Sequence, residues 1–387
     1  MGFSPFDAAA MQRAVELARQ GRGLVEPNPM VGAVVADAAV PRYVGEGWHA
    51  RYGGPHAEVV ALARAGTQAR GGTLYVTLEP CCHHGKTPPC TDAILAAGIR
   101  RVVAATVDPH PLVGGKGLAR LAAAGIAVET GLGEAAALAL TGPYRTLLLR
   151  RRPWVIAKWA TGASGGLASP PGRRWLSSAG SRALVHRLRG EVDAIVVGSG
   201  TALADDPLLT ARPAGPRTPL RVVLDGRGRL PLTSRLVATV AEAPVLVVTS
   251  AAADPAWVAA LRAAGADVWV GTTSSPGARL AEVLAELGRR RCTNVLMEGG
   301  AQLLHEAFEA GLVDEAWVFV TDAPAADPTA AIRDVAGLEI ESVEMIEGDI
   351  LLRASCPRPF PTRPWAGSDG SDVTCDRSAR EPHSPEG

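Results

Sequence analysis

Apolar residues along the chain recur at two spacings, one typical of amphipathic helices and one typical of buried strands. In residues 7–20 the spacing is helical, with Asp7 placed to cap the helix and Gly21 to stop it. Strands that alternate with helices predict an α/β domain with a mostly parallel or mixed sheet. The elements expected in the first third are the helices 7–20, 56–65, 91–98 and 117–125 and the strands 31–36, 71–79, 100–108 and 126–131.

A second alternation of strands and helices follows the arginine-rich stretch 150–153, which we interpret as a domain boundary. Its apolar runs predict a sheet of at least six strands with helices on its faces. The chain is thus expected to divide into one domain at 1–146 and another at 152–356. From 357 to 387 aliphatic residues are few and Pro, Ser and Gly are many, so a disordered tail is expected. The strands expected in the second domain are 153–160, 192–200, 220–226, 243–250, 266–271, 294–300 and 313–320, and the helices are 177–190, 255–265, 279–290 and 302–311.

Composition narrows the classes of protein to which the chain can belong. Of its 387 residues 47% are hydrophobic and 20% are charged, as in globular proteins with ordinary cores. Lys plus Arg and Asp plus Glu number 39 each, so there is no overall basic field to attract nucleic acid. No apolar run is long enough to span a bilayer, and no signal peptide is recognisable. We therefore expect a cytoplasmic protein without nucleic-acid or membrane partners.

Three of the six cysteines lie close together, which favours a metal site over a disulfide framework. His56 offers a nitrogen, and Cys81 and Cys90 offer two thiolates, which gives Zn²⁺ three protein ligands and leaves one position to water. Glu58 follows the histidine at the start of the same predicted helix. It is placed to take a proton from the attacking water and pass it to the substrate ring and the departing ammonia. This pattern predicts a zinc-dependent deaminase.

The spacing of the two cysteines leaves an alternative open. Deaminases of this class carry H-x-E followed by P-C-x-x-C, whereas here eight residues separate Cys81 from Cys90. A structural zinc site needs a fourth protein ligand, and Cys82, His83 or His84 could supply it. We expect these three side chains to line the substrate pocket or to face solvent instead. Cys90 directly precedes an expected helix, whose N-terminal dipole should favour its thiolate.

Five segments of the first half form a specific pattern, namely PNPMVG (27–32), GEGWH (45–49), GGPHAE (53–58), YVTLEPCCHHGKTPPC (75–90) and DPHPLVGGKG (108–117). Together they resemble the deaminase half of the bifunctional riboflavin-biosynthesis deaminase/reductase family. The resemblance implies a cytidine-deaminase-like α/β/α domain that deaminates diaminohydroxyphosphoribosylaminopyrimidine, a pyrimidine ribose phosphate. It also implies that Asn28 binds the pyrimidine. His49, Lys86 and Asp108 are the implied contacts to the pyrimidine or to its ribose phosphate.

The pattern continues in the second half, in Lys158 and in the segments HRLRG (186–190), DAIVVGSGTALADDPLLTAR (193–212), RVVLDGRGRL (221–230) and MEGGAQLLHEAFEAGLVDE (297–315). These are similar to the family's reductase half, a dihydrofolate-reductase-like α/β domain that uses NADPH to reduce the ribosyl group of the product to ribityl. The GSGT and EGG turns leave backbone N–H groups open to a phosphate, and Arg189 and Arg212 offer paired donors. The sequence G-x-G-x-x-G is absent from the chain, so a Rossmann domain is not predicted.

The resemblance also assigns individual residues of the second half. The implied substrate contacts are Arg189, Leu209, Arg212 and Glu298, and the implied cofactor contacts are Ala160, Trp175, Thr201, Asp205, Gly299 and Gly300. Surface ion pairing is the alternative role for Arg189, Asp205, Arg212 and Glu298. The predicted cofactors are therefore Zn²⁺ and NADPH, and assembly into a homo-oligomer is left open.

Three stretches of the second half depart from the family pattern, at 161–166, 172–175 and 318–330. An acidic residue and a following base are missing after Lys158, and a serine is missing before Trp175. Two interpretations stay open, an NADPH-dependent reductase with altered loops and a monofunctional deaminase whose reductase domain is catalytically impaired. A nucleic-acid-binding or RNA-editing protein is disfavoured by neutrality and by an aromatic content of 4%.

Overall fold

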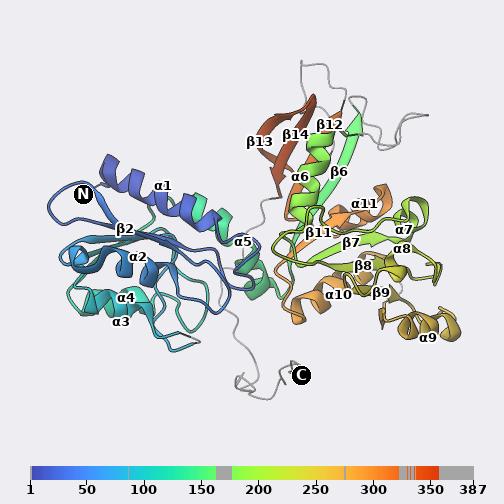
Figure 1. Ribbon diagram of the computed structural model, residues 1–387, viewed down its shortest axis with the longest axis horizontal. Coiled ribbons are helices and arrows are strands. Elements are labelled where there is room, and N and C mark those ends of the chain that lie inside the picture. The colour runs from blue at the N-terminus through green and yellow to red at the C-terminus, as the bar shows by residue number, and fades with distance from the viewer. Residues whose placement is uncertain are drawn as a thin grey trace, which may run out of the picture.

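The computed structural model consists of two α/β units that lie side by side, each built on its own sheet (Figure 1). Among the described residues no helix is both long and apolar enough to cross a membrane. Lys86, Trp175, most of the three departing stretches and the expected tail lie outside the described residues. The structure describes residues 2–85, 87–162, 177–273, 276–321, 329, 332, 335 and 337–356.

The first unit contains a mixed five-stranded sheet in the order β2-β1-β3-β4-β5. Strands β2, β1 and β3 are antiparallel neighbours, and β3, β4 and β5 are parallel, as the alternation of strands and helices predicts. The strands are β1 (Gly32–Ala36), β2 (Tyr43–Trp48), β3 (Thr73–Val76), β4 (Arg101–Ala104) and β5 (Ala127–Thr130), and the helices are α1 (Pro5–Arg19), α2 (Ala57–Ala65), the 3-10 turn η1 (Gly66–Ala69), α3 (Cys90–Ala96), α4 (Lys116–Ala123) and α5 (Glu134–Arg150).

Helices cover both faces of this sheet, because alternate residues of each buried strand point to opposite sides. In β1, Ala33 and Val35 pack in the core formed with α2, α3 and α4. Val34 and Ala36 pack on the other face, in the core formed with α1 and α5. The arrangement is the expected α/β/α sandwich, and it presents the start of α2 and the start of α3 at one edge of the sheet.

Helix α1 begins earlier than expected, and Asp7 is not its N-cap. Ser4 caps the helix, its side chain accepts a hydrogen bond from the Asp7 N–H, and the Asp7 carboxylate accepts one from the Ser4 N–H. This reciprocal pair is a capping box with Asp7 at its third helical position. Asp7 is buried and also accepts hydrogen bonds from Tyr75 and Arg101, so it fastens α1 to two strands of the sheet.

Strand β2 and the segment GEGWH place helix α2 by close approach. A Cβ on Gly45 would lie 2.1 Å from the Ala61 carbonyl oxygen, and a Cβ on Gly47 would lie 2.5 Å from that of Ala57. Only glycine fits at both positions, because the backbone of α2 occupies the space that a side chain would need. These glycines therefore set the position of the first turn of α2.

The second unit contains a nine-stranded sheet in the order β10-β9-β8-β7-β11-β6-β12-β14-β13. Neighbouring strands from β10 to β12 in this order are parallel, and β14 is antiparallel to both of its neighbours, β12 and β13, so that β13 and β14 form a hairpin at one edge. Helices α10 and α11 pack on one face and α6 to α9 on the other. The strands are β6 (Trp154–Gly162), β7 (Ala194–Gly198), β8 (Leu220–Leu224), β9 (Val245–Thr249), β10 (Asp267–Val270), β11 (Asn294–Glu298), β12 (Glu315–Thr321), β13 (Glu339–Ile346) and β14 (Asp349–Ser355). The helices are α6 (Ala179–Arg189), α7 (Ser199–Asp205), α8 (Arg235–Ala238), α9 (Pro255–Ala263), α10 (Pro276–Arg289) and α11 (Ala301–Glu309).

The two units meet at helix α5 and the arginine-rich stretch that follows it (Figure 1). The Arg152 guanidinium donates to both carboxylate oxygens of Asp314, at 2.5 and 2.9 Å, and Arg150 lies 3.5 Å from the same carboxylate. Asp314 also accepts the backbone N–H of Val155, the second residue of β6. The expected boundary at 146–152 thus falls on the last turn of α5 and on residues bound to the second sheet.

Candidate active sites

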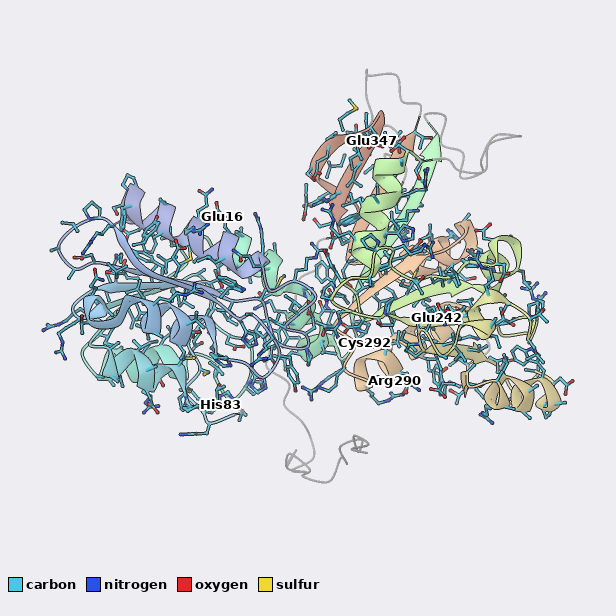
Figure 2. The ribbon with its side chains drawn as sticks, viewed as in Figure 1. Glu16, His83, Glu242, Arg290, Cys292 and Glu347 are labelled. Atoms are coloured by element: carbon cyan, nitrogen blue, oxygen red, sulfur yellow. The ribbon has the colours of Figure 1, made fainter. Side chains whose placement is uncertain are left out.

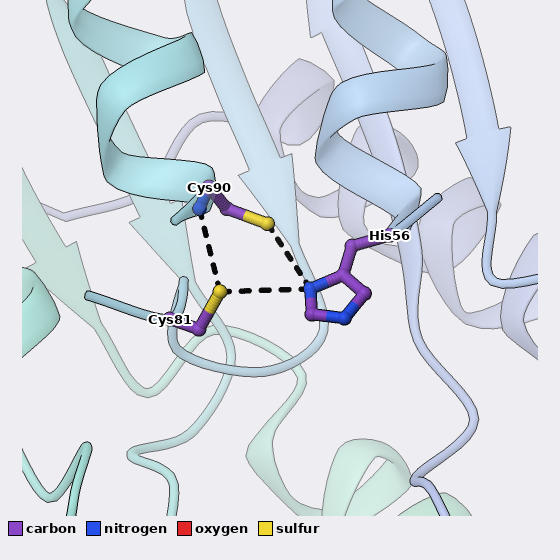
Figure 3. Close-up of side chains that lie close together, drawn as sticks. All are labelled: His56, Cys81 and Cys90. Carbon is purple, nitrogen blue, oxygen red and sulfur yellow. Dashed lines mark hydrogen bonds between the residues drawn. The ribbon is translucent and has the colours of Figure 1, made fainter. Parts of the chain in front are cut away.

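A cluster of three potential metal ligands lies beyond the carboxyl end of β3, the central strand of the first sheet (Figure 3). His56 Nδ1 lies 3.2 Å from Cys90 Sγ and 3.6 Å from Cys81 Sγ. The three ligand atoms all lie within 4.8 Å of one another, and Cys90 is buried. One nitrogen and two sulfurs at this separation suit a single tetrahedral Zn²⁺ with its fourth position open.

The helix ends around the cluster orient its sulfur atoms. His56 is the N-cap residue of α2, and Cys90 is the first residue of α3. The Cys90 backbone N–H donates to Cys81 Sγ at 3.3 Å, and the Thr91 N–H donates to the Cys81 carbonyl oxygen. The N-terminus of α3 therefore contacts the sulfur of Cys81, whereas the sequence analysis assigned its dipole to Cys90. Hydrogen bonds from the Cys90 thiol and from His56 lower the pKa of Cys81 to about 4.

Glu58 lies directly beside this cluster, in the first turn of α2, and its side chain is buried. Burial raises the pKa of its carboxyl, against the opposing effect of His56. A carboxyl group with a raised pKa exchanges protons more readily near neutral pH than an exposed one. Its position after the N-cap agrees with the prediction that it acts next to the metal without ligating it.

The alternative fourth ligands do not join the cluster in the described part of the chain. Cys82 Sγ contacts the Leu112 carbonyl oxygen at 3.8 Å, and the His83 ring stacks on His110 at 6.2 Å between centroids. His84 is exposed to solvent. A set of three ligands supports a catalytic zinc site more than a structural one.

Two predicted substrate contacts lie together next to the metal cluster. The Asn28 amide lies 3.3 Å from His49 Nε2, and His49 Nδ1 lies 3.0 Å from the Pro55 carbonyl oxygen. The His49 ring meets the His56 ring edge-on at 5.4 Å. Burial lowers the pKa of His49, which favours a neutral ring that can exchange hydrogen bonds with a polar heterocycle.

Asp108 is held at its carboxylate by Tyr144, a residue that no sequence motif singles out. Its carboxylate accepts the Tyr144 hydroxyl at 3.0 Å and the His110 backbone N–H at 2.8 Å, and burial raises its pKa. Tyr144 belongs to α5, which no apolar spacing predicted. Glu79 belongs to the segment YVTLEPCCHHGKTPPC, whose spacing does not indicate what Glu79 does. It accepts four backbone N–H groups, from Asp108, Gly115, Gly117 and Leu118, at 2.8–3.3 Å.

Most of these groups line one cavity of about 840 Å³, a size typical of small-molecule sites. Its walls include Asn28, His49, His56, Glu58, Cys81 and Asp108. Lys86, the remaining predicted contact of the first half, lies outside the described residues. The first half therefore gathers its described candidate residues, apart from the buried Cys90, around a single partly enclosed cavity.

The second half places a charged group at the adjoining ends of β6, β11 and α6. The Arg189 guanidinium donates to both oxygens of Glu298, at 2.6 and 2.8 Å, and both side chains are largely buried. Burial acts to raise the pKa of Glu298, but Arg189 and Lys158 outweigh it and keep the pKa below its ordinary value. Burial lowers the pKa of Lys158. Surface ion pairing thus does not describe Arg189 and Glu298.

Arg212 and Leu209 lie in the loop that faces this pair. Arg212 Nη1 donates to the Thr210 hydroxyl at 3.1 Å and lies close to the His186 ring. No carboxylate among the described residues pairs with Arg212. Leu209 is buried with a φ of 52°, which turns the chain at this point. Because Glu298 already occupies the fork of Arg189, Arg212 is the better placed of the two arginines to meet an anionic group.

The glycine-rich ends of β7 and β11 lie side by side, since the two strands are parallel neighbours. Helices α7 and α11 start directly after them, with Gly198 and Gly300 as N-caps. The Gly300 N–H donates to the Thr201 hydroxyl at 3.1 Å. A Cβ on Gly198 or Gly200 would meet no atom within 4 Å, so the backbone here is open to a ligand. Two helix starts and an open backbone fit the phosphates of NADPH.

The other residues predicted to contact the cofactor lie near these glycine-rich ends of β7 and β11. Ala160 lies on β6 and is half-buried, and Gly299 stands between β11 and the cap of α11. Asp205 is the last residue of α7 and is exposed to solvent. Trp175 lies outside the described residues. A single dinucleotide can lie against these residues and Thr201 whether or not their side chains contact one another.

Comparison with known families and structures covers both halves. Residues 4–106 match the cytidine and deoxycytidylate deaminase zinc-binding region, and residues 153–324 match the RibD C-terminal domain. The riboflavin biosynthesis protein RibD of Aquifex aeolicus is 40% identical over 81% of this chain and 86% of its own length.

Two solved structures are similar over nearly the whole chain. RibD of Acinetobacter baumannii has 34% identity and a TM-score of 0.76, and the alignment covers 90% of this chain and 98% of that one. A diaminohydroxyphosphoribosylaminopyrimidine deaminase/5-amino-6-(5-phosphoribosylamino)uracil reductase of Thermotoga maritima has 34% identity and a TM-score of 0.75 over the same shares. The likeness therefore extends across both sheets in a single alignment.

Proposed function

This chain belongs to the RibD family of riboflavin-biosynthesis proteins, and from that membership we propose that its two halves catalyse two successive reactions on one pyrimidine ribose phosphate. It is a zinc-dependent deaminase and an NADPH-dependent reductase. The first reaction removes an amino group from diaminohydroxyphosphoribosylaminopyrimidine by hydrolysis. The second reduces the ribosyl group of the product to ribityl. We assign the first reaction to residues 1–146 and the second to 152–356.

The observation that carries the deaminase assignment is the three-ligand cluster with a buried carboxyl beside it. Zinc, when bound by His56, Cys81 and Cys90, supplies Lewis acidity that lowers the pKa of a bound water. Glu58 takes one proton from the attacking water and gives it to the ring nitrogen, and it then passes the second proton, from the new hydroxyl group on the ring carbon, to the departing amine, which leaves as ammonia. Asn28 and His49 offer hydrogen-bonding groups to the polar edge of the pyrimidine.

The reductase assignment depends on the Arg189–Glu298 pair and on the open backbone at the glycine-rich ends of β7 and β11. NADPH, when bound there, supplies the hydride. Arg189 and Lys158 keep Glu298 ionised, so Glu298 can accept a hydrogen bond from a ribose hydroxyl. Arg212, which pairs with no carboxylate among the described residues, offers its guanidinium to the substrate phosphate. Ala160, Thr201, Gly299 and Gly300 border the space assigned to the nicotinamide dinucleotide.

The competing function, a deaminase with an inert second half, is not favoured. An inert domain would have no need of a half-buried lysine beside a buried ion pair, since buried charges cost stability when they serve no function. Residues 163–166, 172–175 and 322–328 make up much of the sequence that differs from the family pattern. They lie outside the described residues and give no evidence against a reductase. The proposed ligands are the phosphorylated pyrimidine and NADPH, and no nucleic-acid partner is proposed. The proposed location is the cytoplasm. A homo-oligomer is compatible with this assignment.

A single-turnover assay tests both halves of the proposal. Zinc-loaded protein is mixed with the diaminopyrimidine ribose phosphate, and ammonia is measured. The deaminated product is then mixed with the same protein and NADPH, and loss of NADPH absorbance is followed. We expect one ammonia per substrate and one NADPH per product. No ammonia would refute the deaminase, and ammonia without product-dependent NADPH oxidation would establish the inert second half.

A further inference from the structure

The cavity that contains the zinc cluster is not walled by the first half alone. Arg151, at the end of α5, and Gly288, Arg289 and Arg291, at the end of α10, line it together with the deaminase residues. Figure 2 labels Arg290 and Cys292, on the side of the second unit that faces the first. A Cβ on Gly288 would lie 2.3 Å from the Arg151 carbonyl oxygen, so the end of α10 packs directly on the end of α5.

Charge is distributed unevenly along this cavity. The carboxylates in its wall, Glu58, Glu79 and Asp108, all belong to the first half, and three guanidinium groups come from the junction with the second. Glu79 is already fully engaged by four backbone N–H groups, and Asp108 by Tyr144 and His110. The junction end of the cavity is therefore cationic, while the other end holds the zinc ligands.

Arg291 is the arginine of this group best placed to bind a ligand. Its guanidinium lies over the Tyr52 ring at 6.0 Å, and it forms no ion pair with a carboxylate of the described residues. Arg289 and Arg290, by contrast, both bind Glu286, and Arg290 also binds Asp267. Three residues of chain lie between Tyr52 and the metal ligand His56, so their Cα atoms are four steps of chain apart, at most about 14 Å. One elongated molecule can thus reach both ends.

We propose that Arg291, supported by Arg289, binds the phosphate of the deaminase substrate while the pyrimidine lies at the zinc cluster. The second half would then supply part of the substrate specificity of the first. This inference depends on the proposed deaminase function. A guanidinium suits the role because its planar fork pairs with two phosphate oxygens, and a partly enclosed cavity strengthens that pairing. The two halves are therefore coupled through the substrate of one of them.

The experiment compares deamination of the phosphorylated substrate with that of the same compound lacking its phosphate. Three variants of the full-length protein are assayed for ammonia release, namely Arg291→Gln, Arg291→Lys and Arg290→Gln. Gln keeps an unbranched polar side chain but removes the charge, Lys keeps the charge, and Arg290 is an adjacent arginine that does not line the cavity. Inorganic phosphate is tested as a competitive inhibitor of each, and thermal midpoints are compared with wild type.

For Arg291→Gln we expect the KM for the phosphorylated substrate to rise about 10- to 100-fold, as for a lost hydrogen-bonded charge pair. The KM for the dephosphorylated compound should not change, inhibition by phosphate should weaken, and Arg291→Lys should recover part of the loss. Arg290→Gln should behave as wild type. Equal changes in KM for both substrates, or an unchanged KM for the phosphorylated substrate in Arg291→Gln, would overturn the proposal. Wild-type protein that deaminates neither compound would refute the deaminase function instead.

Discussion

The two candidate sites differ in how far apart in the sequence their polar partners lie. In the first half His56 and Cys90 are 34 residues apart and Cys81 lies between them, so one short stretch supplies every ligand. In the second half Arg189 and Glu298 are 109 residues apart, and Lys158 comes from a third segment. The first site is thus recognisable from local motifs, whereas the second exists only once the sheet has brought β6, β11 and α6 together.

This contrast makes a first prediction, that the two chemistries can be separated by one substitution. Glu58→Gln should lower the deaminase kcat by a factor on the order of 10²–10⁴, the usual contribution of a general acid-base group. Zinc content should remain at one per chain because Glu58 is not a ligand, and NADPH oxidation with supplied product should be unaffected. Ammonia release, zinc analysis and the reductase assay check the three parts. Normal ammonia release would remove Glu58 from its role.

The second prediction concerns the long-range pair. Glu298→Gln leaves the largely buried Arg189 without its counterion, which should destabilise the second half by about 3 kcal/mol. Reductase activity should be lost at a lower temperature than in wild type. Deaminase activity, measured on the same heated samples, should show a much smaller shift. If both activities fall together, the two halves unfold as one unit and the contrast between them is weaker than we infer.

A third prediction tests how the first half is fastened. Asp7→Asn should destabilise that half by about 2 kcal/mol, because the buried Asp7 carboxylate accepts the Ser4 N–H in the capping box of α1 and also accepts hydrogen bonds from Arg101 and Tyr75. Burial alone would raise the pKa of Asp7, but Arg101, Tyr75 and Ser4 hold it far below its ordinary value. Glu16→Gln, which removes an exposed pair with Arg13, is the control and should change little.

The pH dependence of Asp7 follows from the sign of that shift. An acid whose pKa is lowered in the folded state stabilises the fold above its unfolded pKa, and the stabilisation is lost as pH falls below that value. The difference in thermal midpoint between wild type and Asp7→Asn should thus be constant from pH 7 to about pH 5 and should shrink below about pH 4. A difference that grows on acidification would contradict the assignment.

The smallest expected effect is at the glycine-rich edge of the second site. A methyl group at Gly200 meets no protein atom, so Gly200→Ala should fold normally. It projects into the space assigned to NADPH, and we expect the KM for NADPH to rise about tenfold, equivalent to about 1.4 kcal/mol. Fluorescence titration of NADPH and the thermal midpoint check this. An unchanged KM would move the dinucleotide away from α7.

Much of the architecture was predictable because strands and helices alternate with clear apolar spacing. The missed elements have physical reasons. Helix α5 contains Gly142 and Pro143 and is apolar without a clear stripe, and β2 carries two glycines in place of strand-forming side chains. Strand β13 is an edge strand exposed on both sides, so its residues show no simple alternation of buried and polar positions.

The candidate sites were predictable to different degrees for a related reason. His56, Glu58, Cys81 and Cys90 were identified because zinc chemistry demands those residue types at close spacing. Tyr144 and Glu79 were not given roles, since a tyrosine or glutamate that fixes a loop has no motif of its own. A contact from Arg291 into the first site could not be read from the sequence, because it depends on how α10 packs against α5.

The most direct test of the central claim, that one chain performs deamination and then reduction, is the order of events in a single turnover. Wild-type protein is mixed with limiting diaminopyrimidine ribose phosphate and excess NADPH, and ammonia and NADPH are followed separately over time. Ammonia should appear first, NADPH oxidation should follow after a lag, and the two final amounts should be equal. NADPH oxidation without preceding ammonia, or ammonia with no NADPH oxidised, would contradict it.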